Sequence, residues 1–218
     1  MQPTRTGLPL HRLFALLLPL FLNAGCALAP PPPPSATTLA SFTPEQEYLL
    51  RLRHWSINGR LAVKHRGEGM MATLIWNQDG EDYQIDLHAP SGGHSLRLLG
   101  TEQGVTLTTN EGEVITASTP ESLLYHHFGL QIPISSIYYW IRGIPAPGRS
   151  HQSLDDAGNL LRLEQGDWTV AIPKYHNEPF AQGSIPLPQS LTIEGEESRL
   201  RIAIHRWSKL AFSPLSPT

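Results

Sequence analysis

The sequence has few of the residues that metal, redox or nucleic-acid chemistry requires. Cys26 is the one cysteine among 218 residues, which excludes an internal disulfide, a multi-cysteine zinc site and a cysteine-ligated iron–sulfur cluster. Charged residues make up only 16% of the chain, and its formal net charge is −3. Because no cluster of lysines and arginines stands out, the chain lacks the electrostatic footprint of a protein that binds nucleic acid.

Polar residues in catalytic arrangements are also scarce. Adjacent histidines on a helix point in divergent directions, unlike metal ligands spaced four residues apart, and a neighbouring His and Ser on a strand point to opposite faces. No serine lies in a nucleophile-elbow motif. We therefore expect no enzyme activity, no catalytic residue, no metal site and no cofactor. An enzyme, the alternative class, would have to use one of three clusters: His126-His127, Asp155-Asp156 or Gly92-Gly93-His94-Ser95.

The apolar run near the N-terminus is short. It extends from Leu13 to Leu22, and Arg5 and Arg12 precede it. This run is too short to span a bilayer as a permanent helix, and Pro19 interrupts it, so a transmembrane anchor is the weaker interpretation. A basic start followed by a short apolar run is typical of a secretory signal. We therefore expect residues 1–25 to be a signal peptide.

The single cysteine follows two small residues, Ala24 and Gly25. This arrangement resembles a bacterial lipobox, in which the chain is cleaved before the cysteine and the thiol of Cys26 is diacylated. Asn23 departs from the motif, which normally has an aliphatic residue there, and an ordinary signal peptide is the alternative. More than one acyl chain would make membrane attachment stable. By resemblance to bacterial lipoproteins, Ala27 permits sorting to the outer membrane.

A proline-rich segment follows the cysteine. Five consecutive prolines, Pro30 to Pro34, predict a stiff and extended spacer that cannot form a packed core. We interpret residues 26–42 as a lipid-anchored tether, with a proline-rich ligand for a partner module as the alternative. The remaining chain is then expected to form a folded domain over residues 43–210 and a C-terminal tail over residues 211–218.

Alternation of apolar and polar residues dominates the folded part. A period of two is typical of strands with one buried face, and the short connectors rich in Gly, Asn and Pro favour antiparallel neighbours. The segments with this pattern are 55–64, 70–76, 83–88, 96–98, 160–165, 168–172, 190–193 and 199–207.

Capping residues predict three short helices between or before these strands. The first begins at Pro44, after Thr43 as its cap and with Gln46 at the capping-box position; the second is Pro120 to Phe128, between Thr119 and Gly129; the third runs from Ser135 or Ser136 to Arg142.

About ten strands with one apolar face, and only three short helices to cover it, require a curled sheet. The economical arrangement lays the helices across the open mouth of that sheet and leaves a space inside. The predicted fold is therefore mainly β: an incomplete, half-open antiparallel β-barrel of about ten or eleven strands, with a lid of short α-helices over an apolar cavity.

Several segments, in order and with their spacing, resemble the LolB family, whose members accept lipoproteins at the outer membrane from the periplasmic carrier LolA. The resemblance implies the same half-open barrel and a cavity that holds acyl chains. It implies a lipid-anchored protein of a Gram-negative outer membrane, facing the periplasm. The matching segments, besides Cys26, are Trp55 to Val63, Leu74 to Gly92, Gly129 to Pro145, Gly166 to Ile172 and Leu200 to Trp207.

The resemblance also implies a loop between two strands that faces the membrane, formed here by Pro90, Ser91, Gly92 and Gly93. Members of the family can carry a large apolar residue between this Pro and Gly, whereas this chain has Ser91. Serine lacks the apolar transfer energy of a leucine, about 2 kcal/mol. Membrane contact by this loop is therefore in question, unless neighbouring residues supply it.

Candidate residues for the cavity or its lid lie on the inferred apolar faces or in the matching segments. For each of them ordinary core packing is the alternative, since apolar strand faces are normally packed. These candidates are Trp76, Tyr83, Ile85, Leu87, Leu96, Leu98, Trp140, Trp168 and Ile202.

The expected function is that of a monomeric receptor that takes acylated lipoproteins from a LolA-type carrier and helps to incorporate them into the outer membrane. Its partners would be the loaded carrier, the lipoprotein cargo and membrane lipid through Cys26, with no nucleic acid. A lipid-anchored module for other hydrophobic ligands would have the same fold, so cargo and carrier separate the two functions. A purely structural lipoprotein is a third alternative.

Overall fold

A computed structural model describes residues 42–90, 95–180 and 183–213. The predicted signal peptide, Cys26, nearly all of the tether and the loop residues Ser91, Gly92 and Gly93 lie outside the described residues. Within the described ranges, no helix is long and apolar enough to cross a membrane.

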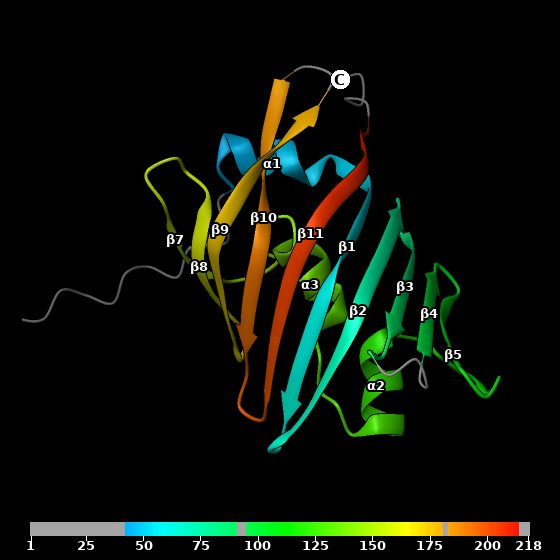
Figure 1. The fold of residues 1–218 in the computed structure, drawn as a ribbon. Helices are drawn as coiled ribbons and strands as arrows, with labels where there is room; N and C mark the ends of the chain where they lie inside the picture. Colours follow the sequence, from blue (N-terminus) through cyan, green and yellow to red (C-terminus); the bar gives the residue numbers. More distant parts are fainter. Residues whose placement is uncertain (1–41, 91–94, 181–182, 214–218) are drawn as a thin grey trace, which may run out of the picture. The chain divides into compact units, whose positions relative to one another are not determined.

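Eleven strands form one antiparallel sheet (Figure 1). Their order is β6-β5-β4-β3-β2-β1-β11-β10-β9-β8-β7, so the chain runs outward from β1 to one edge and returns from the other edge to β11 beside β1. In the described part of the chain the edge strands β6 and β7 do not pair with each other, which leaves the barrel open. This confirms the predicted half-open antiparallel barrel of ten or eleven strands.

The strands differ in length, and the longest ones form the middle of the sheet. Their bounds are β1 Leu52–His65, β2 Glu68–Asp79, β3 Asp82–His88, β4 Ser95–Thr101, β5 Gly104–Thr109, β6 Val114–Ala117, β7 His151–Leu154, β8 Leu160–Gln165, β9 Trp168–Phe180, β10 Gly183–Glu194 and β11 Ser198–Phe212.

Two of the three helices begin where the capping residues predict. In α1, Pro44–Leu50, Thr43 and Gln46 form a complete capping box. In α2, Pro120–Phe128, the Thr119 side chain accepts a hydrogen bond from the Ser122 N–H, and Gly129 ends the helix in the left-handed conformation, at φ 66°.

The third helix, α3, starts one or two residues earlier than predicted. It spans Ile134–Trp140, with Pro133 at its N-cap and no capping hydrogen bond from a side chain. The prediction that Ser135 or Ser136 begins the helix was therefore wrong. Proline has no side-chain oxygen that could accept a hydrogen bond from the first turn, so the usual capping signal is missing.

The strands β9 and β10 extend well beyond the predicted segments 168–172 and 190–193. Prolines in both strands obscure the alternation, because proline is normally excluded from the interior of a sheet. Here Ile185 and Leu187 are buried on either side of Pro186. The pairing with β9 shifts register after Pro188, whose carbonyl accepts a hydrogen bond from the Trp207 indole N–H at 3.0 Å. An irregular ladder thus accommodates the prolines.

The buried residues gather on the inner face of the sheet. Along β11, Leu200, Ile202 and Ile204 are buried while the residues between them are exposed, as the predicted alternation requires. An aromatic cluster lies around Trp55, whose ring centroid is 5.3 Å from that of Trp76 and 5.5 Å from that of Trp207. The helices α2 and α3 lie behind the sheet as Figure 1 is drawn, on this inner side.

Candidate functional site: an apolar cavity under the helices

A cavity of about 230 Å³ lies between the inner face of the sheet and the segment that contains α2 and α3. All of the described residues that line it are hydrophobic. The sheet contributes Leu61, Val63, Met70, Leu74, Trp76, Ile85, Leu87, Leu96, Leu98, Leu107, Leu200 and Ile202; the helices and the link between them contribute Leu124, Phe128, Leu130, Ile132, Ile134 and Ile137.

The sheet wall follows directly from the period of two. Residues two apart on a strand point to the same face, so Leu96 and Leu98 on β4 both reach the cavity, as do Ile85 and Leu87 on β3. The register places Ile85 opposite Leu98. Cross-strand pairs of this kind make a continuous apolar wall.

The opposite wall depends on the turn after α2. The left-handed Gly129 reverses the chain, and its N–H donates to the Tyr125 carbonyl at 2.9 Å. The following Leu130 donates its N–H to the Leu124 carbonyl at 3.2 Å, which holds the linking segment against α2. A carboxylate oxygen of Glu121 also accepts a hydrogen bond from the Ser135 N–H at 2.8 Å, so α2 and the start of α3 are tied together.

Two of the described residues that line the cavity are also exposed to solvent. Met70 at the start of β2 is 44% exposed and Phe128 at the end of α2 is 41% exposed, although both line the cavity. A large apolar side chain that faces water on one side and an apolar space on the other marks an entrance. We interpret the end of α2 and the start of β2, which carry these two side chains, as the entrance to the cavity.

The structure brings six of the nine candidate residues together at the cavity: Trp76, Ile85, Leu87, Leu96, Leu98 and Ile202. Tyr83 does not line the cavity, but its ring lies 6.3 Å from that of Trp76, and burial raises the pKa of its hydroxyl.

The two other tryptophans among the candidates lie away from the cavity. Trp140 is fully buried at the end of α3, and its indole N–H donates to the Gln165 side chain at 2.9 Å. Trp168 lines a separate groove beside the β10–β11 turn. Pro90, the one described residue of the predicted membrane-facing loop, lines a groove on the outer face of the sheet.

From the helical side, the sequence candidates included only Trp140, which lies on α3 but does not line the cavity. Leu130 and Ile132 lie in a short link with no helical period, and nothing in the sequence marks such a link as part of a cavity wall. On the strands, Leu61, Val63 and Leu74 had the correct alternation. The period fixed their face, but it carries no information on which part of that face the helices leave uncovered.

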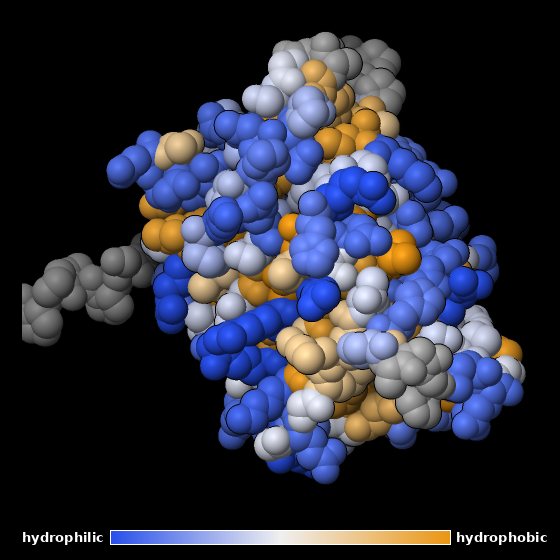
Figure 2. Space-filling model, viewed as in Figure 1, coloured by the Kyte–Doolittle hydropathy of each residue, from blue (hydrophilic) through white to orange (hydrophobic). Residues whose placement is uncertain are grey.

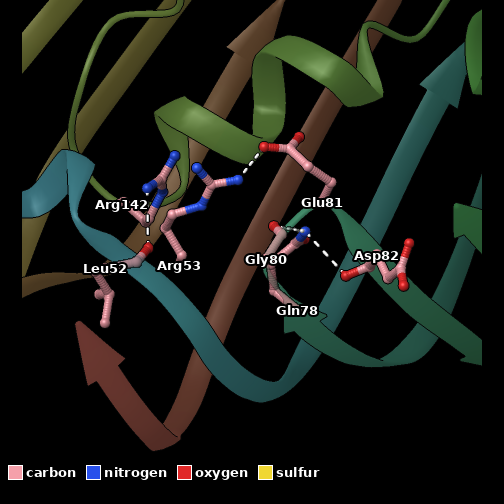
Figure 3. A network of polar contacts seen from close by, with 7 residues as sticks. All are labelled: Leu52, Arg53, Gln78, Gly80, Glu81, Asp82 and Arg142. Carbon is pink, nitrogen blue, oxygen red and sulfur yellow. Dashed lines mark hydrogen bonds and ion pairs between the residues drawn. The ribbon is translucent and has the colours of Figure 1, made fainter. Parts of the chain in front are cut away.

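A hydrogen-bond network holds Trp76 in the cavity wall, and Figure 3 shows the part of it that Gln78 forms with the β2–β3 turn. Its indole N–H donates to the Gln78 side-chain oxygen at 2.9 Å, and the Gln78 amide nitrogen donates to the carbonyls of Gly80 at 3.0 Å and Asp82 at 3.1 Å. A buried indole N–H needs such a partner. Gln78, itself buried, therefore satisfies the tryptophan and fixes the β2–β3 turn at the same time.

Arg142, just after α3, ties that helix to the junction of α1 and β1 (Figure 3). Its guanidinium is fully buried and donates to the carbonyls of Leu49 at 3.2 Å and Leu52 at 3.0 Å, and to the Tyr138 carbonyl at 3.0 Å. The guanidinium carbon also lies 4.0 Å from the centre of the Tyr138 ring. Burial lowers the pKa of Arg142. This end of the helical cover is thus firmly held, opposite the exposed Phe128 end.

The described residues around the cavity offer apolar contact. Among them only the indole of Trp76 carries a hydrogen-bonding group, and its N–H is already bonded to Gln78. A site of this composition binds the hydrocarbon part of a ligand.

Comparisons with known proteins identify the family. The family described as "Outer membrane lipoprotein LolB" matches residues 53–207. An outer-membrane lipoprotein LolB of Coxiella burnetii is 32% identical over 195 residues, covering 88% of this chain and 91% of that protein, and one of Alkalilimnicola ehrlichii is 40% identical over 168 residues, covering 75% and 82%. A solved LolA superfamily protein from Nitrosomonas europaea has 10% identity and a TM-score of 0.43, covering 79% of this chain and 91% of that one. On the sequence matches, the chain belongs to the LolB family.

Proposed function

We propose that this chain is an outer-membrane receptor that accepts acylated lipoproteins from a LolA-type periplasmic carrier and helps to place them in the outer membrane. The observation that carries the proposal is the wholly hydrophobic cavity under α2 and α3, in a chain that belongs to the LolB family. The receptor function requires binding of hydrocarbon chains, and the hydrophobic residues that line the cavity supply the surface for it.

The energy of the acyl chains explains why such a cavity is needed. Each methylene left in water costs roughly 0.8 kcal/mol, so a multiply acylated protein cannot cross an aqueous space without an apolar host. Transfer without an energy source also requires the receptor to bind the chains more favourably than the carrier does, and the bilayer to hold them more favourably still. The receptor is an intermediate in this sequence.

The cavity must expand to hold its cargo. Its volume of about 230 Å³ lies below the roughly 300–1,000 Å³ of pockets that hold small ligands, and several acyl chains are larger than one such ligand. We place the opening at the α2 end, because Phe128 is exposed there, while Arg142 holds the α3 end to the backbone of Leu49 and Leu52. The helices then act as a lid that is fixed on one side.

The proposal includes acylation of Cys26 and a tether over residues 26–42. Residue 42, where the described domain begins, lies sixteen positions after Cys26. At about 3.1 Å per residue an extended segment of this length reaches about 50 Å. Such a tether would let a monomeric domain move between a carrier in the periplasm and the membrane surface. Pro90 and residues 91–93 would be near the membrane in this arrangement, although Ser91 supplies little apolar energy.

Carrier-to-receptor transfer tests this function. A chain from residue 27 onward retains every described residue but has no lipid of its own. It would be mixed with a carrier loaded with a labelled acylated lipoprotein, and the label would be followed by co-purification. We expect the label to move to the receptor. If a control acceptor takes the label and this chain does not, the receptor function is wrong; tight binding of free fatty acids in that case would favour a general lipid-binding module.

A further inference from the structure

The outer face of the sheet carries a cluster of basic residues on β1 and β11. The cavity-lining residues of these strands point inward, so the side chains of the residues that alternate with them point outward, from the other face of the sheet. Four of these are basic, in a chain where 19 acidic residues outnumber 16 basic ones. They are Arg60, Lys64, Arg199 and Arg201, and all four are exposed. Arg199 forms an ion pair with Glu194 at 2.7 Å.

Two shallow grooves run through this cluster. One has a volume of about 600 Å³ and the other about 430 Å³, and both are lined by Ala62, Met71 and Arg201. The register places Ala62 directly between the other two, opposite Arg201 on β11 and Met71 on β2. The small alanine therefore leaves a depression with a cation on one side and a methionine, 66% exposed, on the other.

No carboxylate is among the described residues that line the two grooves. Among the described residues, Arg60, Lys64 and Arg201 form no ion pair, whereas the arginines 53, 66, 97, 162 and 199 each have a carboxylate partner. Exposed Arg149 and Arg206 also form no ion pair with a described residue, but they do not line the two grooves. Figure 2, which shows this face, has a hydrophobic area over β1 and β2 bordered by strongly hydrophilic side chains. The surface thus combines unneutralised positive charge with exposed apolar area.

We propose that these two grooves, with Arg60, Lys64, Met71 and Arg201, form a binding surface for anionic phospholipid headgroups. Guanidinium and ammonium groups pair with phosphate, and each basic residue near an anionic bilayer contributes to attraction. A methionine beside them can enter the apolar edge of the headgroup layer, a combination of charge and apolar area that is typical of surfaces that lie on membranes. An acidic protein would use the charge but would not need the exposed methionine.

The surface lies within reach of an anchored chain. Ala62 is ten residues along β1 from Leu52, about 34 Å at the rise of a strand, and the proposed tether extends to about 50 Å. This step depends on the membrane anchoring in the proposed function. Headgroup binding would then orient the domain with the outer face of β1, β2 and β11 on the bilayer. It would also keep the entrance at Met70 and Phe128 close to the membrane, because the β1–β2 hairpin contributes residues both to the entrance and to the grooves.

Vesicle binding by the chain from residue 27 onward tests the proposal without the lipid anchor. The test variant is Arg60→Gln/Lys64→Gln/Arg201→Gln, and the matched control replaces three other exposed basic residues, Arg149→Gln/Arg162→Gln/Lys174→Gln. Partition onto vesicles of phosphatidylcholine, with and without phosphatidylglycerol, is measured by co-sedimentation at low and high salt. We expect binding that requires phosphatidylglycerol and weakens at high salt.

Each lost charge should weaken binding about fivefold, so the test variant should bind on the order of 100-fold more weakly, and the control should bind clearly better than the test variant. Met71→Ser should lower binding to the same vesicles at high salt. Equal binding by the test variant and the control, or no preference for phosphatidylglycerol, would overturn the proposal. Loss of carrier binding with unchanged vesicle binding would assign the surface to a protein partner.

Cargo transfer from a carrier in the absence of membranes separates this proposal from the receptor function. The test variant retains every residue that lines the cavity. Its transfer should therefore equal that of the unmodified chain even when its vesicle binding is lost.

Discussion

The hydrogen bond between Trp76 and Gln78 should couple the stability of the cavity wall to the β2–β3 turn. Trp76 is 3% exposed and Gln78 is 6% exposed, and they are joined at 2.9 Å. Gln78→Leu would leave the buried indole N–H without a partner, which costs about 1–3 kcal/mol. The carbonyls of Gly80 and Asp82 would lose the amide as well, but they belong to a turn that is only partly buried, where water can replace it.

A double-mutant cycle isolates this hydrogen bond. Trp76→Phe removes the donor and some packing area, so it has a cost of its own. Once the donor is gone, however, Gln78→Leu no longer leaves an unsatisfied indole N–H, and its additional cost should be smaller by about 1–2 kcal/mol. The free energy of unfolding is measured in urea for the unmodified chain, both single variants and the double variant. Additive costs, within a few tenths of a kcal/mol, would refute the role given to Gln78.

Three further predictions concern the sheet, the entrance and an ion pair. Gly59→Ala should destabilise the fold by about 3 kcal/mol or more, because the new Cβ would lie 2.2 Å from the Ala203 carbonyl oxygen; urea unfolding measures this. Phe128→Ser should slow cargo transfer several-fold with little loss of stability, since the side chain is partly in water already. Asp86→Asn should reduce the loss of stability in acid: burial tends to raise the pKa of Asp86, but hydrogen bonds from Arg97 and a neighbouring glutamine outweigh it and hold the pKa below its ordinary value.

The sign of the acid effect follows from that lowered pKa. The stabilisation by ionised Asp86 is present above the pKa of the unfolded chain, near 3.9, and is lost as the pH falls through the lower pKa of the folded chain. Thermal unfolding measured between about pH 6 and pH 2 should therefore show a steeper decline for the unmodified chain than for Asp86→Asn.

Each of these variants has a control in a similar position. Gly69→Ala on β2 has its nearest contact at 3.8 Å and should change stability by less than about 0.5 kcal/mol; an equal loss from both glycines would contradict the close approach. Tyr125→Ser removes an exposed aromatic side chain from α2, the helix that carries Phe128, but outside the cavity. If both variants slow cargo transfer equally, Phe128 has no specific role at the entrance. Glu102→Gln, in an exposed turn, is the control for Asp86→Asn. If it reduces the loss of stability at low pH as much as Asp86→Asn does, the effect is not specific to Asp86.

The sequence predicts most of this fold because the local signals and the tertiary structure agree. The capping box at Thr43 and Gln46 and the left-handed Gly129 are local features, and each lies where its helix begins or ends. The alternation along β11 predicts the buried face of the sheet, since a strand with one solvated face must alternate. Because few helices are available to cover the apolar face of so many antiparallel strands, the sheet must curl into an open barrel to bury that face.

The parts that were missed depend on tertiary contacts. The ladder around Pro186 and Pro188 is held by its neighbours against the normal exclusion of proline. Trp140 and Trp168 are large aromatic residues of the kind expected in a cavity wall. However, Trp140 is packed at the end of α3, and Trp168 lies at the edge of another groove. A period of two or 3.6 gives the face on which a residue lies, whereas the boundary of a cavity depends on where the helices stop.

Photo-crosslinking from β4 tests the central claim that the cavity holds acyl chains. Leu96 lines the cavity and is half-buried, whereas Leu99, on the opposite face of the same strand, is 38% exposed to solvent. A photoactivatable residue is placed at one position or the other in the chain from residue 27 onward, which is then supplied with carrier loaded with a lipoprotein labelled in its acyl chains. The account predicts crosslinks to the labelled chains from position 96 and none from position 99. Crosslinks of equal yield from both positions, or from position 99 alone, would contradict it.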